Sequence, residues 1–82
     1  MMPEEIMMPE EMKKICDRLK EICHKRGFTK DEYGIYLFLP FSGQAKKVFG
    51  STENALEEAV KTAEKYEDVD TIVAKYCTLI GV

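Results

Sequence analysis

Three cysteines and one histidine are the residues of this chain whose side chains could act as metal ligands or nucleophiles. Cys23 and His24 are adjacent, Cys16 lies seven residues before Cys23, and Cys77 lies near the end of the 82 residues. Structural zinc needs four ligands at short loop spacings such as C-x-x-C, and that pattern is absent. On a helix, Cys16 and Cys23 share a face, whereas His24 lies about 100° further round. We therefore expect two core thiols and a surface histidine, with no metal site.

The same residues form a poor catalytic set. A cysteine nucleophile needs a base within hydrogen-bond reach and a third group that orients the base. Adjacent positions on a helix point apart, so Cys23 and His24 cannot serve each other. An odd number of cysteines in an acidic chain without a secretory signal fits reduced thiols. We expect no catalytic residues, no enzyme activity and no cofactor.

An acidic cluster and scattered glycines are the remaining candidates for ligand chemistry. Glu67, Asp68 and Asp70 offer carboxylates, but calcium takes roughly six to eight oxygen ligands, and the D-x-D-x-D-G pattern is missing. A solvated loop is the expected outcome. The glycines form neither G-x-x-x-x-G-K nor G-x-G-x-x-G, so we expect no phosphate-binding loop.

Length and composition indicate a single soluble domain. The chain has 82 residues, of which 45% are hydrophobic and 33% charged, and it is too short for two cores. Its longest apolar run is far below the roughly 20 residues that span a bilayer. The acidic start lacks the basic region of a signal peptide. We expect a flexible or short helical arm at residues 1–8, one domain at residues 9–82, no membrane contact and a cytoplasmic location.

Two stretches have the apolar spacing of amphipathic helices. The first should begin near Pro9, which suits the first helical position, and end before Gly27, which suits the left-handed residue after a helix. The second should begin at Ser51 or Thr52, which can cap it. The apolar stripes are Met12, Ile15, Cys16, Leu19, Ile22 and Cys23 in the first helix, and Leu56, Ala59, Val60, Ala63 and Tyr66 in the second.

Three other runs favour β-strands. Residues 33–39 are apolar on both alternating faces, as in a central strand, and residues 45–49 carry two lysines, as edge strands do. Residues 71–82 form the third run. Residues 29–32 have the spacing of a capping box, but Gly34 and the β-prone run after it favour a turn there.

These elements predict an α+β fold, a two-layer α/β sandwich with the order α-β-β-α-β. The first two strands form a hairpin, and a right-handed crossover through the second helix makes the third strand parallel to the second. The central first strand then gives a three-stranded antiparallel sheet with strand order 2-1-3. This is the split β-α-β arrangement, half of a ferredoxin-like fold, with both helices on one face.

The sheet face opposite the helices is the expected binding surface. Alternation along the first strand places Ile35, Leu37 and Leu39 under the helices and leaves Tyr36 and Phe38 on the open side. Two rings on an uncovered sheet are unusual for a monomer. Together with the exposed edge of the second strand, this face supplies six candidate partner-binding residues: Tyr36, Phe38, Val73, Lys75, Lys46 and Lys47.

An open aromatic face without a catalytic set favours a small non-catalytic interaction or regulatory protein. We expect it to form a homodimer or to act as an inhibitor or adaptor of a larger protein. The alternative is single-stranded nucleic-acid binding on the same face, with bases stacked on the rings beside the lysines. The net charge of −3 disfavours this alternative, because neutralising phosphates dominates nucleic-acid affinity.

Overall fold

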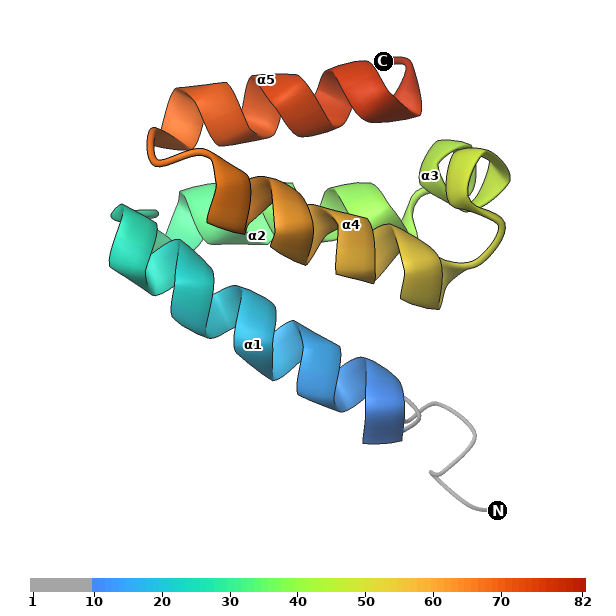
Figure 1. Ribbon diagram of the computed structural model, residues 1–82, viewed down its shortest axis with the longest axis horizontal. Helices are drawn as coiled ribbons and strands as arrows, with labels where there is room; N and C mark the ends of the chain where they lie inside the picture. The colour runs from blue at the N-terminus through green and yellow to red at the C-terminus, as the bar shows by residue number, and fades with distance from the viewer. Residues whose placement is uncertain (1–9) are drawn as a thin grey trace.

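The computed structural model describes residues 10–82, which are helical and contain no β-strand (Figure 1). The predicted α/β sandwich is therefore wrong, and so is the split β-α-β sheet. The arm predicted at residues 1–8 lies outside the described residues. The elements are α1 (Glu10–Arg26), α2 (Lys30–Phe38), the 3₁₀-helix η2 (Leu39–Phe41), α3 (Gly43–Phe49), α4 (Thr52–Lys65) and α5 (Val69–Ile80).

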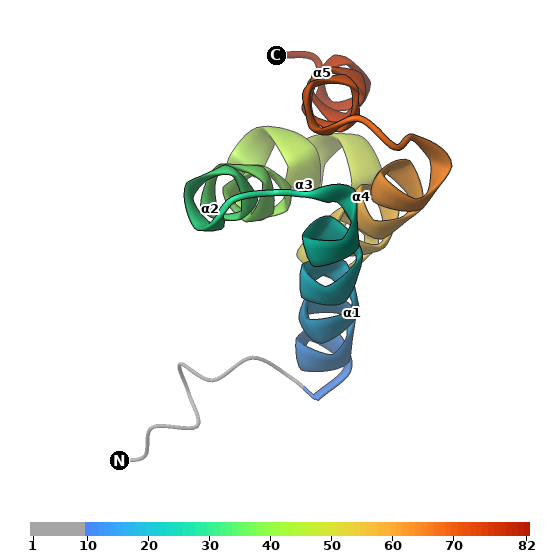
Figure 2. The same cartoon turned by 90° about the vertical axis from the view of Figure 1, so that its left-hand side faces the viewer.

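Helix α4 lies at the centre of the arrangement. In Figures 1 and 2 it runs between α1 on one side and α5 on the other. Helices α1, α3 and α5 and the 3₁₀-helix η2 all contact α4. The buried positions of α4 accordingly form one broad face of the helix: Ala55, Leu56, Ala59, Val60, Thr62 and Ala63.

Both amphipathic helices predicted from the sequence are confirmed. Helix α1 ends in a Schellman motif, in which Gly27 has φ +91°. The Phe28 N–H donates to the Cys23 carbonyl at 3.0 Å, and the Gly27 N–H donates to the His24 carbonyl at 3.1 Å. Helix α4 begins after Ser51, whose hydroxyl accepts from the backbone N–H of Asn54 at 3.1 Å. The predicted start at Pro9 lies outside the described residues.

The predicted first strand is instead helix α2, and a capping box explains the difference. The Thr29 hydroxyl accepts from the Glu32 N–H at 3.1 Å, and the Glu32 carboxylate accepts from the Thr29 N–H at 2.8 Å. These two bonds satisfy donors that the first helical turn leaves unpaired. They offset the cost of Gly34 inside the helix, which is about 1 kcal/mol relative to alanine.

The predicted second and third strands are also helices with side-chain caps. Ser42 accepts from the Ala45 N–H at 3.2 Å at the start of α3. Asp68 accepts from the Thr71 N–H at 3.0 Å at the start of α5, so this residue of the acidic cluster is a helix cap. Glycines with positive φ follow both helices. The β-branched residues of these two segments favour a strand, but caps at both ends stabilise a helix instead.

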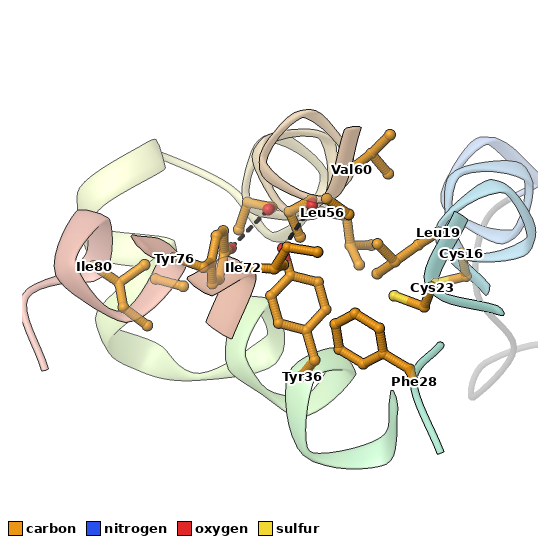
Figure 3. Packing of buried hydrophobic residues seen from close by; sticks show 14 residues of the cluster. Cys16, Leu19, Cys23, Phe28, Tyr36, Leu56, Val60, Ile72, Tyr76 and Ile80 are labelled. Carbon is orange, nitrogen blue, oxygen red and sulfur yellow. Dashed lines mark hydrogen bonds between the residues drawn. The ribbon is translucent and has the colours of Figure 1, made fainter. Parts of the chain in front are cut away.

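Side chains from three helices donate hydrogen bonds to carbonyls on a stripe of alanines along α4. The Tyr76 hydroxyl of α5 donates to the Ala55 carbonyl at 2.7 Å, and the Tyr36 hydroxyl of α2 donates to the Ala59 carbonyl at 2.7 Å (Figure 3). The Arg26 guanidinium of α1 donates to the Ala63 carbonyl at 2.9 Å. These acceptors recur every four residues, one helical turn apart, and an alanine side chain is too small to obstruct the approach to them.

The two tyrosines also form the aromatic centre of the core. Tyr36 packs against Phe28 with ring centroids 5.4 Å apart and against Tyr76 at 5.5 Å, and Phe49 stacks on Tyr76 at 6.1 Å. Tyr36 and Tyr76 are completely buried. Burying a phenol is favourable only when its hydroxyl has a partner, and the α4 carbonyls provide those partners.

We predict that Tyr36→Phe and Tyr76→Phe each lower the free energy of unfolding by about 1 kcal/mol, because each removes one buried hydrogen bond and leaves the ring in place. Urea denaturation at neutral pH measures this change. Tyr33→Phe is the control, since Tyr33 also lies on α2 but its hydroxyl makes no hydrogen bond within residues 10–82. Equal stability of the Tyr36 variant and the Tyr33 variant would contradict the bonding scheme.

We also predict that the protein loses stability above about pH 9. Burial raises the pKa of Cys23 from 9.0 to about 12, and it also raises the pKa values of Tyr36 and Tyr76 above the usual 10.0. The unfolded chain therefore releases these protons at a lower pH than the folded chain, so rising pH favours unfolding. Urea denaturation at pH 7, 9 and 10.5 should show a free energy of unfolding that falls more steeply as the pH rises. The fall should be smaller in Tyr76→Phe than in the wild type. Constant stability up to pH 10.5 would be inconsistent with these buried groups.

Candidate interaction surface

The two rings predicted to share one binding face lie in opposite environments. Tyr36 is 0% exposed and Phe38 is 70% exposed. Residues two apart in a strand share a face, but in a helix they lie about 200° apart. The open aromatic sheet face therefore does not form, and Tyr36 is not available to a partner or to a nucleic-acid base.

The other four predicted binding residues lie on two helices. Val73 and Lys75 belong to α5, where Val73 is half-buried and Lys75 is exposed with its ammonium 5.7 Å from the centre of the Tyr66 ring. Lys46 and Lys47 are exposed on α3. Whether any of these residues binds a partner stays a prediction.

An apolar surface does form between α2 and α5, and it contains two of the six predicted residues. Ile35 is 62% exposed beside Phe38, although the strand pattern had placed Ile35 under the helices. A shallow hollow of about 730 Å³ extends over Ile35 and Phe38, and a second of about 290 Å³ joins Ile35 to α5. We define the α2–α5 surface by the large apolar residues that line these hollows: Ile35, Phe38, Leu39, Val69 and Val73.

A glycine opens the backbone of α2 within this surface. Gly34 lies in the middle of the helix, and a Cβ added to it would meet no atom within 4 Å. Its backbone torsions are ordinary, so the helix itself does not require a glycine here. The missing side chain leaves the backbone accessible beside Ile35 and Phe38, where a docking segment could approach closely.

The rim of the α2–α5 surface is mainly acidic. Asp31 lines the larger hollow together with Lys30, while Glu32 and Asp70 line the smaller one. Asp31 and Asp70 are exposed to solvent. The rim therefore carries three carboxylates against one ammonium group, and this imbalance favours a positively charged ligand.

The cysteines and the histidine of α1 lie where the helical pattern predicts. Cys16 and Cys23 are buried, at 7% and 0% exposure, and His24 is on the surface of α1. Burial, with a smaller effect of the Asp17 charge, raises the pKa of the Cys16 thiol. Residues 10–82 contain no group of three His, Cys, Asp or Glu side chains that could hold a metal ion.

None of the helices within residues 10–82 has the combined length and apolar character needed to cross a membrane.

We predict that a thiol reagent modifies Cys77 first in the folded protein, because Cys77 is only partly buried, whereas burial holds Cys16 and Cys23 in the protonated form. Mass spectrometry of time-resolved labelling identifies the order, and all three should react in urea. Cys77→Ser should abolish the fast phase. Rapid modification of Cys16 and Cys23 in the folded state would show that the α1–α4 contact opens readily.

Comparisons of this chain with protein-family models, with curated proteins and with solved structures find no significant match. Neither family membership nor a structural relative therefore indicates a function for this chain.

Proposed function

We propose that this protein is a small non-catalytic interaction protein, an adaptor or inhibitor that docks onto a larger protein through the α2–α5 surface. The observation that carries the proposal is the exposure of Ile35 and Phe38, at 62% and 70%, side by side on one helix. Large apolar side chains gathered over adjoining hollows are typical of a surface that another protein covers.

The partner is inferred to be a basic amphipathic helix. Its apolar side chains would fill the hollows on either side of Ile35, and Gly34 would let its backbone come close to α2. Lysine or arginine residues flanking its apolar stripe would meet Asp31 and Asp70 on the rim. Apolar grooves with charged rims accept amphipathic helices in this way.

The charge of the rim favours this partner over a second copy of the chain. In a symmetric dimer the same surface faces itself, so the acidic rims would be brought together. Like charges placed together across an interface oppose association. Single-stranded nucleic acid is also disfavoured, because its phosphates would meet the acidic rim. The face on which its bases were expected to stack also requires Tyr36, which is buried.

The experiment uses a model helical peptide of leucine and lysine as the probe, with a leucine–glutamate peptide of the same length and spacing as its counterpart. We expect the wild-type protein to bind the lysine peptide and to show amide chemical-shift changes along α2 and α5. The double variant Ile35→Gln, Phe38→Gln should weaken this binding about thirtyfold or more, because truncating interface anchors commonly costs about 2 kcal/mol.

A matched control separates this surface from general stickiness. Val48 and Val82 are also exposed, at 47% and 71%, and lie outside the α2–α5 surface, so Val48→Gln, Val82→Gln should bind the lysine peptide as the wild type does. Equal binding of the two peptides would contradict the role of the acidic rim. A dimer seen by sedimentation and lost in Ile35→Gln, Phe38→Gln would assign the surface to a second copy instead.

A further inference from the structure

A second concave region of the described molecule lies between α4 and α5, and its charge is opposite to that of the α2–α5 rim. This cleft has a volume of about 400 Å³, within the usual range for small-molecule sites. The two helices that form it lie side by side in Figures 1 and 2. Lys61 and Lys65 line it from successive turns of α4 and Lys75 lines it from α5, against one carboxylate, that of Glu58.

These lysines are poorly neutralised. Lys61 pairs with Glu58 at 3.5 Å, but within residues 10–82 neither Lys65 nor Lys75 has a carboxylate within salt-bridge distance. Like charges four residues apart on a helix destabilise it slightly. A local excess of positive charge is notable in a chain that carries 15 acidic and 12 basic side chains. An anion in the cleft would relieve the repulsion.

A tyrosine brings two of these cations together. The ammonium groups of Lys65 and Lys75 lie 5.6 and 5.7 Å from the centre of the Tyr66 ring, so each makes a cation–π contact with it. The Tyr66 hydroxyl makes no hydrogen bond within residues 10–82 and remains available as a donor. Leu79, which is 48% exposed, adds an apolar wall to the same cleft.

We propose that the α4–α5 cleft binds a nucleoside diphosphate or triphosphate. The phosphates would contact the ammonium groups of Lys61, Lys65 and Lys75, and the base would rest against Tyr66 and Leu79. The cleft is larger than a single phosphate requires. Its ammonium groups suit the phosphates of a nucleotide, and its ring and apolar wall suit the base. This inference is independent of the α2–α5 surface.

The test titrates ADP, pyrophosphate and adenosine into the protein and follows amide chemical shifts. At about 0.15 M salt, where diffuse attraction between exposed charges is largely screened, we expect ADP to shift amides of α4 and α5 and adenosine to bind more weakly. Lys65→Gln, Lys75→Gln should weaken ADP binding at least about tenfold, equivalent to about 1.4 kcal/mol. Tyr66→Leu should weaken ADP binding by a larger factor than pyrophosphate binding, because only ADP loses the contact between its base and the ring.

The control variant changes two exposed lysines outside the cleft, Lys46→Gln, Lys47→Gln, and removes the same total charge. It should bind ADP within about twofold of the wild type, and circular dichroism should show that both double variants remain helical. Equal weakening by the two pairs would mean diffuse electrostatic attraction and would overturn the site. Tighter binding of a single-stranded oligonucleotide that depends on Lys46 and Lys47 would also overturn it, as would ADP shifts outside α4 and α5.

Discussion

The described fold depends on one alanine stripe of α4 that accepts hydrogen bonds from three other helices. The carbonyls of Ala55, Ala59 and Ala63 receive bonds from Tyr76, Tyr36 and Arg26, which belong to α5, α2 and α1. Each carbonyl is one turn from the next, so the three bonds fix where each neighbouring helix lies along α4. A domain of this size buries limited apolar surface, and directional bonds from buried rings add to what its core supplies.

The sequence predicts part of this arrangement and misleads about the rest for a physical reason. The helices α1 and α4 have long apolar stripes with unambiguous spacing, and both are correctly predicted. The run at residues 33–39 is short and apolar on both sides, and the runs at residues 45–49 and 71–82 have no apolar stripe as long as those of α1 and α4, so strand and helix patterns both fit all three. The decisive signals are the caps at Thr29, Ser42 and Asp68. The capping box at residues 29–32 is visible in the sequence, but the β-propensity of the residues that follow it favours a strand.

The error in secondary structure explains what happens to the predicted binding surface. A strand puts Tyr36 and Phe38 together, whereas the helix sends one into the core and leaves the other in solvent. Helical spacing from Asp31 would have selected Ile35 and Phe38 as the outer stripe, which is where the apolar surface lies. The α4–α5 cleft has no comparable sequence signal, because Lys75 meets Tyr66 only through the packing of two helices.

Tyr36 and Tyr76 reach α4 from helices, and proton–proton contacts measured by nuclear Overhauser spectroscopy are the most direct test of this arrangement. We expect contacts between the ring of Tyr36 and Ala59 and between the ring of Tyr76 and Ala55, with helical carbon shifts through residues 33–38 and 71–80. Close pairs of α-protons between residues 33–39 and 71–82, with extended carbon shifts in both segments, would instead establish a sheet and contradict the helical fold.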